Sequence, residues 1–361
     1  MEISLLSRKP SPDYRRLLTA LWRRGLPDRV PFVELFADQE IIDECNRRMD
    51  YAPEGKTDQE RALRAQINFY YHMGYEYIPF DNIDGLEFPI DHLEAADTAT
   101  LSRGTRHWTS EHSGPITNWA DFERYPWPVP GRLDTRRLEL AARLLPEGMC
   151  LTAACHSIFE YVTWLMGYET LCYKLYDEPD LVDAMFERVG RLHLAAAEVL
   201  VQLDRLEILF GGDDMGFKTG TMVGPDDLKT KSLVWHKKIA AVAHAHGKPY
   251  VLHSCGKLDA IMDFLIDEVR IDARHSFEDA HSPVTEEKRK YGGRLALCGG
   301  IDVDLLCRST PEQVRAYTRR VLEACMPGGG YCLGTGNTVA NYIPVDNYLA
   351  MLQEGVASGV Y

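Results

Sequence analysis

The sequence predicts an α/β fold, namely a single (β/α)8 TIM barrel that takes up residues 1–361. Short β-branched runs alternate with amphipathic stretches of helix length, and eight such strand-then-helix units follow one another. A length of 361 residues suits one barrel domain. Parallel strands joined by helices place the helices outside and an active site at the carboxyl ends of the strands.

Each expected strand is a short apolar run bounded by turn-forming or charged residues. The eight strands are expected at 30–36, 75–80, 149–154, 206–211, 249–254, 270–275, 295–300 and 330–335. Helices are expected at 41–49, 59–73, 134–145, 157–166, 180–204, 226–246, 257–268, 311–325 and 345–355. The segment 83–133, after the second strand, interrupts this alternation with "FPIDHL" and "YPWPVPG". We interpret it as an inserted hairpin and loop near the mouth of the site.

Composition limits the classes of function. The formal net charge is -14, and no Lys/Arg run offsets it, so a nucleic-acid partner is not expected. The sequence shows no apolar stretch of signal-peptide length and none that would span a bilayer. We therefore expect a cytoplasmic protein with no membrane contact. Its nine cysteines are expected as free thiols rather than as a disulfide framework. A homodimer stays open.

Several acidic and imidazole groups fall where the predicted strands end. Glu34 lies at the end of the first strand, His156 follows the third, and Asp213 and Asp214 follow the fourth in "FGGDDMG". In a barrel such residues face the site, so these four are the candidate catalytic groups. Asp213, Asp214 and His156, together with Tyr161, would place or protonate the oxygen that leaves a substrate. For Asp213, the capping of a loop is an equally good interpretation.

A set of metal-binding residue types follows the later strands. His253 and Cys255 end the fifth strand, Glu278 lies 25 residues after His253, and Cys332 lies 79 residues after it, on the last strand. One nitrogen, one oxygen and two sulfurs form a ligand mixture that zinc takes in tetrahedral geometry. The alternative is that the cysteines are small core residues and that the histidine is a hydrogen-bonded structural one.

At these residues the sequence resembles a known family. "VLHSCGKLDAIMDFLID", "ARHSFED", "ALCGGIDVDLL" and "GGYCLGTGNTV" are similar to the uroporphyrinogen decarboxylase-like superfamily, and specifically to its zinc-dependent methyltransferase branch, which serves corrinoid proteins. The resemblance covers most of the chain and implies a TIM barrel. It also implies a zinc held by His253, Cys255, Glu278 and Cys332. The match to the family pattern is weakest at Glu278.

The resemblance implies methyl transfer between a small molecule and the cobalamin of a separate, transiently bound corrinoid protein. Either a methylated donor, such as an aryl methyl ether in an O-demethylase, methylates cob(I)alamin, or methylcobalamin methylates a zinc-bound thiol. Both directions stay open at this point. The predicted cofactors are therefore Zn2+ and a cobalamin carried by the partner.

Two other functions compete with methyl transfer. A uroporphyrinogen decarboxylase-type lyase would act on a porphyrinogen or another carboxylate. Such enzymes carry an arginine-rich turn after the first strand, whereas this chain has "VELFADQE", whose acidic groups would repel a polycarboxylate. A non-catalytic, zinc-stabilised binding protein is the further alternative, but structural zinc usually serves small folds with four Cys or His ligands.

Overall fold

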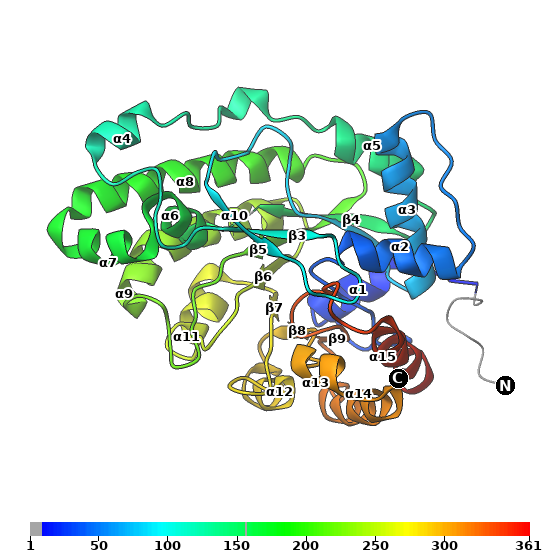
Figure 1. Cartoon of the computed structure of the whole chain (residues 1–361). Helices are drawn as coiled ribbons and strands as arrows, with labels where there is room; N and C mark the ends of the chain where they lie inside the picture. Colours follow the sequence, from blue (N-terminus) through cyan, green and yellow to red (C-terminus); the bar gives the residue numbers. More distant parts are fainter. Residues whose placement is uncertain (1–8, 156) are drawn as a thin grey trace.

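A curled parallel sheet forms the centre of the protein (Figure 1). The computed structural model describes residues 9–155 and 157–361. The sheet has seven strands in the order β1-β4-β5-β6-β7-β8-β9, and every neighbouring pair is parallel. The strands are β1 (Tyr77–Phe80), β4 (Cys150–Cys155), β5 (Leu206–Gly212), β6 (Tyr250–His253), β7 (Ala273–His275), β8 (Ala296–Cys298) and β9 (Tyr331–Cys332). This confirms the predicted TIM-barrel class.

The first predicted strand, 30–36, does not form a ladder. The segment instead makes isolated parallel bridges from Phe32 to Leu333 and from Ala37 to Val339, beside the end of β9. Toward β1, the hydroxyl of Tyr77 takes the place of a backbone partner. It accepts a hydrogen bond from the Glu34 amide at 2.7 Å and donates one to the Glu34 carbonyl at 2.5 Å. The barrel is therefore closed on this side by a side chain.

Helices cover the outer face of the sheet, as expected for strands joined by right-handed crossovers (Figure 1). They are α1 (Tyr14–Leu21), α2 (Gln39–Arg48), α3 (Asp58–Met73), α4 (Trp119–Arg124), η2 (Pro130–Arg132), α5 (Arg136–Leu144), α6 (Phe159–Met166), α7 (Tyr168–Asp177), α8 (Pro179–Leu200), α9 (Pro225–Asp227), η3 (Leu228–Ser232), α10 (Leu233–Ala245), α11 (Met262–Phe264), η4 (Leu265–Val269), α12 (Val284–Tyr291), α13 (Val303–Arg308), α14 (Pro311–Cys325) and α15 (Val345–Ser358). Of the α-helices, the sequence did not predict α1, α4, α7, α12 or α13. Four of these five are only six to eight residues long, too short for a clear period.

The inserted segment contains the hairpin expected from the sequence. Strands β2 (His92–Ala96) and β3 (Thr105–Thr109) pair antiparallel. Asn341, in the loop after β9, donates one hydrogen bond to the Asp97 carboxylate at 2.7 Å and one to the Leu101 carbonyl at 2.9 Å. Arg103 pairs with Asp38, at the start of α2, at 2.8 Å. The hairpin is thus tied to the loops at the carboxyl end of the strands.

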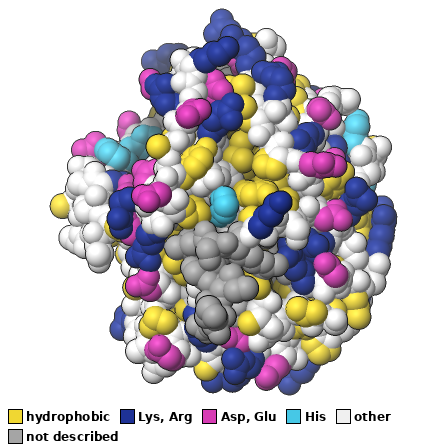
Figure 2. All heavy atoms as spheres, turned by 90° about the vertical axis from the view of Figure 1, so that its right-hand side faces the viewer, with side chains coloured by type: hydrophobic (Ala, Val, Ile, Leu, Met, Phe, Trp, Pro, Cys, Tyr) yellow, Lys and Arg dark blue, Asp and Glu magenta, His cyan; other side chains and the backbone are white. Residues whose placement is uncertain are grey.

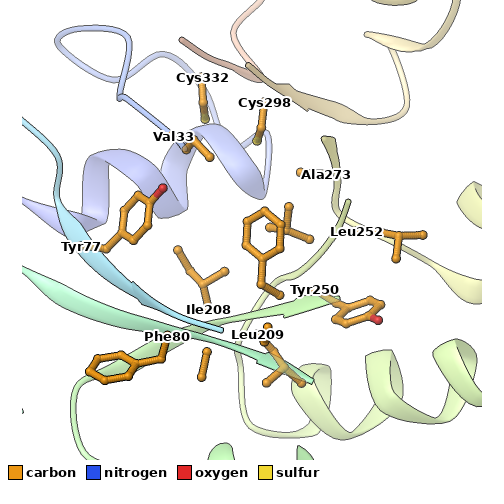
Figure 3. Close-up of a cluster of buried hydrophobic side chains, with 14 of the residues drawn as sticks. Val33, Tyr77, Phe80, Ile208, Leu209, Tyr250, Leu252, Ala273, Cys298 and Cys332 are labelled. Carbon is orange, nitrogen blue, oxygen red and sulfur yellow. The ribbon is translucent and has the colours of Figure 1, made fainter. Parts of the chain in front are cut away.

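Buried hydrophobic side chains from most strands form a cluster on the two faces of the sheet (Figure 3). Ile208 and Leu209 of β5, Tyr250 of β6 and Phe80 of β1 are each at most 4% exposed. Burying such side chains stabilises the fold by about 1.5–3 kcal/mol each. Cys298 and Cys332 lie in this cluster next to each other and beside Val33. These two thiols therefore belong to the packed interior.

The outer surface carries both signs of charge. On the side formed by α2, α3 and α15, Lys/Arg and Asp/Glu side chains are interspersed rather than gathered into a patch of one sign (Figure 2). In the described part of the chain, no helix is both long enough and apolar enough to cross a membrane.

Candidate metal and substrate site

Three potential metal ligands meet where β5 and β6 end. His253 is the last residue of β6, Cys255 follows two residues later, and Asp214 follows β5. One ligand atom from each lies within 4.8 Å of the others. Nε2 of His253 is 3.3 Å from Oδ1 of Asp214 and 3.5 Å from Sγ of Cys255. Among the residues that the structure describes, no other group of three or more His, Cys, Asp or Glu meets this geometry.

The backbone around Cys255 holds this arrangement in place. The Cys255 amide donates a hydrogen bond to Oδ1 of Asp214 at 2.8 Å, which ties the loop after β6 to the loop after β5. The next residue, Gly256, has φ +78°, and a Cβ there would lie 2.2 Å from the carbonyl carbon of Gly216. Only glycine fits both the left-handed backbone and this close approach. The turn therefore brings the thiol back over the strand end.

His275, at the end of β7, orients His253. Their Nδ1 atoms are 2.8 Å apart, so one nitrogen must donate and the other must accept. If Nε2 of His253 is to use its lone pair on a metal, its Nδ1 must carry the proton and His275 must accept it. His275 is fully buried, and burial, followed by the charge of His253, lowers its pKa well below 6.5. A neutral His275 can act as this acceptor.

Two polar side chains contact the thiol of Cys255 from other strands. Nδ2 of Asn337, in the loop after β9, donates to Sγ at 3.3 Å. The hydroxyl of Ser276, directly after β7, lies 3.9 Å from Sγ. The sequence reasoning did not select Asn337, Ser276 or His275 as site residues. His275 ends its strand as His253 does, and Ser276 directly follows it, so position at a strand end was a usable signal for these two. Asn337 lies five residues beyond β9 and gave no such signal.

The surroundings shift the pKa values of Asp214 and Cys255 in opposite directions. Burial by itself would raise the pKa of Asp214, but the hydrogen bond and charge of His253 and the Cys255 amide outweigh burial and lower this pKa to about 2. Burial, followed by the charge of Asp214, raises the pKa of the Cys255 thiol well above 9. A cation bound between the two groups would offset this repulsion and favour the thiolate.

A cavity of about 390 Å³ opens directly beside His253 and Asp214. This size suits a small organic ligand. Its lining comes from the ends of β1, β4, β5 and β6 and from the loops after the first and last barrel segments: Leu35, Phe36, Pro79, Phe80, Asp81, Thr152, Ala154, Ser157, Glu160, Trp164, Phe210, Gly212, Asp214, His253, Asn337 and Thr338. A second hollow, of about 400 Å³, lies at the opposite strand ends near Leu26 and Met326, away from these groups.

Glu160 is a cavity residue that the sequence reasoning also missed. It lies in the first turn of α6, and its carboxyl group accepts a hydrogen bond from the hydroxyl of Ser157. Burial, followed by the charges of Asp214 and Asp213, raises its pKa well above 4.5. Glu160 thus brings a second carboxyl group to the wall next to Asp214.

Asp213 caps the start of helix α6. Its carboxylate accepts hydrogen bonds from the amides of Phe159 and Glu160, at 3.0 and 2.9 Å, at the start of α6. It also accepts one from Ser232 and contacts Nε2 of His236 at 2.8 Å. The side chain is fully buried. This arrangement matches the capping interpretation of Asp213, and the residue acts on the site by fixing the helix that carries Glu160.

The structure does not bring Cys332 or Glu278 to the metal-binding group. Cys332 is fully buried beside Cys298, its register partner, within the apolar cluster (Figure 3). Glu278 is half exposed, and its Oε2 lies 3.2 Å from Nε2 of His281. The physical reason for Cys332 is its packing. Although it ends β9, its side chain lies against Cys298 in the apolar cluster, and the contact with Cys255 comes five residues later, from Asn337.

The two remaining candidates differ in position. Glu34 is buried, and its carboxyl group accepts hydrogen bonds from the Thr335 amide at 2.9 Å and from the hydroxyls of Thr335 and Tyr75. Burial raises its pKa to about 8. Glu34 ties the first barrel segment to the loop after β9 and does not line the cavity. His156 lies outside the described residues.

Comparison with solved structures identifies the fold. A methyltransferase from Methanosarcina mazei is similar over 99% of both chains, with a TM-score of 0.68 and 16% sequence identity. A putative vitamin-B12 independent methionine synthase from Listeria monocytogenes is similar over 91% of this chain and 95% of its own, with a TM-score of 0.47 and 14% identity. No curated protein sequence matches the chain.

A family model matches a continuous part of the sequence. The model of uroporphyrinogen decarboxylase (URO-D) covers residues 106–355, which is more than half of the chain and includes every residue of the group His253, Cys255 and Asp214. The chain therefore belongs to the uroporphyrinogen decarboxylase (URO-D) family.

Proposed function

We propose that the protein is a zinc-dependent methyltransferase that moves a methyl group between a small molecule and the cobalamin of a separate corrinoid protein. The observation that carries this proposal is the convergence of His253, Cys255 and Asp214 beside a cavity of about 390 Å³. The likeness in fold to a methyltransferase agrees with it.

The donor set fits zinc. One imidazole nitrogen, one thiolate sulfur and one carboxylate oxygen are ligands that zinc accepts, and three protein ligands leave a fourth position for a substrate. Two of the three residues that would hold the metal, His253 and Asp214, also line the cavity, so a substrate bound there would lie beside them. When bound, zinc would act as a Lewis acid toward an oxygen or a thiol of the substrate.

Each side chain around the group has a separate task. His275 holds His253 in the tautomer whose Nε2 lone pair faces Asp214 and Cys255. Asn337 donates a hydrogen bond to Cys255, which steadies negative charge on the sulfur. Glu160 and Ser157 present a hydrogen-bonded carboxyl group to the ligand space, at the position where a proton can be given or taken.

Of the two directions of transfer, we favour the one from a small methylated donor to cob(I)alamin. A cavity with apolar and aromatic walls provides a place for the body of such a donor, as in other small-molecule sites. A decarboxylase acting on a polycarboxylate is less well supported. Within the described chain, the cavity lining has several carboxyl groups and no Lys or Arg to hold carboxylates.

The corrinoid protein would dock over the carboxyl ends of the strands. Around this end the chain exposes large apolar side chains, among them Phe217 after β5 and Tyr342 after β9, which are 62% and 44% exposed. Trp108 of the hairpin and Phe36 are exposed as well. A transient partner that covers this rim would bring its cobalt to the cavity.

The test uses purified, zinc-loaded protein with free cobalamin. Methyl transfer to cob(I)alamin from methoxylated and other methylated compounds is followed by the absorbance change of the corrin. The reverse reaction uses methylcobalamin with thiols. We expect transfer that disappears on chelation and returns with zinc. If zinc-loaded protein catalyses transfer in neither direction, with free cobalamin or with a copurifying corrinoid protein, the proposal is wrong.

A further inference from the structure

The walls of the cavity combine aromatic rings with carboxyl groups. Phe36, Phe80, Trp164 and Phe210 supply the rings, and they come from four different parts of the barrel. Phe210 and Phe80 are nearly buried behind the wall, while Phe36 is 40% exposed at the mouth. Aromatic faces attract cations, and the attraction grows when the cation leaves water.

Over the residues that the structure describes, the cavity has several carboxyl groups and no basic side chain of the Lys or Arg kind. Asp81, Glu160 and Asp214 line it, and among the described residues no Lys or Arg does. Arg137, which does not line the cavity, lies 5.0 Å from the centre of the Phe80 ring and is paired with Asp84 at 3.3 Å. That cation is therefore already matched by its own carboxylate.

Asp81 is the carboxylate whose presence the fold does not explain. It directly follows β1 and is exposed, and no hydrogen bond or ion pair of its side chain occurs within the described residues. Asp214, by contrast, is engaged with His253 and Cys255. A zinc ion would offset the charges of Asp214 and Cys255, whereas the Asp81 carboxylate shares the cavity with the aromatic rings and has no partner among the described residues.

We propose that the cavity binds a small cationic molecule, namely a compound with a methylated ammonium group. This inference rests on the proposed function in one respect only: the cation would be the methyl donor. Its C–N bond would break with both electrons left on nitrogen, and the electron pair of cob(I)alamin would form the new bond to the methyl carbon.

Three probes of the same shape and different charge test the proposal by equilibrium binding. Choline carries a trimethylammonium group, 3,3-dimethylbutan-1-ol is its neutral carbon analogue, and 3,3-dimethylbutanoate is a related anion. Binding is measured by calorimetry on the full chain, with and without zinc. We expect choline to bind at least about tenfold more tightly than the alcohol, and the anion to bind most weakly of the three on the metal-free protein.

Variants locate the effect in the cavity. Asp81→Asn should weaken choline binding about fivefold or more and leave the alcohol unchanged, because the two probes differ only in charge. Glu123→Gln, an exposed site on α4, changes the net charge of the chain equally and should leave both affinities unchanged. Trp164→Leu should weaken choline more than the alcohol.

The outcomes separate this inference from the proposed function. Equal affinities for choline and the alcohol, or a choline affinity that Asp81→Asn does not change, would overturn the cation site even if methyl transfer from neutral donors is found. Selective binding of choline without any methyl transfer would uphold the cation site and count against the methyltransferase.

Discussion

Two cysteines, Cys255 and Cys332, both lie near the ends of barrel strands, yet their surroundings differ completely. Cys255 follows β6 by two residues and is contacted by His253, Asn337 and Ser276. Cys332 lies within β9 and is packed with Cys298 among apolar side chains. A shift of two or three residues along a strand thus separates a candidate ligand from a core residue.

The largest expected effect is the loss of zinc affinity when Cys255 is replaced. Cys255→Ser should lower zinc affinity by more than about 100-fold, because serine is a poor zinc ligand of nearly the same size. The measurement is competition with a chromophoric chelator. Cys298→Ala is the matched control, since it removes a thiol from the barrel interior, and it should bind zinc as the unchanged chain does. Undiminished zinc binding in Cys255→Ser would remove Cys255 from the site.

The next effect concerns the residue behind His253. His275→Phe removes the acceptor for Nδ1 of His253 while keeping a ring in the buried space, and it should lower zinc affinity about 10- to 100-fold. His244→Phe serves as a control for the loss of a histidine, since His244 pairs with Asp272 away from the site. A merely structural role for His275 would lower thermal stability and leave the zinc affinity of the folded protein unchanged.

A smaller effect is expected at the second cysteine, and on a different quantity. Cys332→Ser places a hydroxyl among apolar side chains, which should lower the free energy of unfolding by about 1–3 kcal/mol. Zinc affinity should not change. Denaturant unfolding and the chelator competition are run on the same sample. A variant that loses zinc but not stability would place Cys332 in the metal site after all.

The last effect leaves zinc binding aside and concerns the pH dependence that Glu34 gives to stability. Its pKa is raised to about 8 by burial, so the folded state holds its proton at pH values where the unfolded chain, with a pKa near 4.5, has lost it. The contribution of Glu34 to stability therefore falls as the pH rises from about 4.5 to about 8, by at most about 1.4 kcal/mol per pH unit. Glu34→Gln should lack this fall. Parallel curves of unfolding free energy against pH for both proteins would refute the raised pKa.

The sequence was a good guide to the barrel and to part of the site. Period and turn residues located seven strands of the parallel sheet, and the His-x-Cys spacing selected His253 and Cys255 correctly as neighbours at a strand end. The first predicted strand does not form a ladder with its neighbours. Pro31 lacks an amide hydrogen, and the hydroxyl of Tyr77 bonds to the Glu34 backbone in place of a strand partner.

The third member of the group could not be chosen from spacing. Asp213 and Asp214 are adjacent, and the backbone at the end of β5 turns Asp213 toward the start of α6 and Asp214 toward His253. Asn337 was missed because an amide is not a typical zinc ligand, and Cys332 was preferred for its chemistry although β9 ends with it. In both cases the direction in which each side chain points decides which residue reaches the site. Three-dimensional packing sets that direction.

The metal shell is the most direct test of the account. Zinc-loaded protein should contain about one zinc per chain, and X-ray absorption at the zinc edge should show one sulfur and otherwise nitrogen or oxygen neighbours, at roughly 2.3 Å and 2.0–2.2 Å. The sulfur signal should vanish in Cys255→Ser and persist in Cys332→Ser. Two sulfurs in the unchanged protein, or none, would contradict a site made by His253, Cys255 and Asp214.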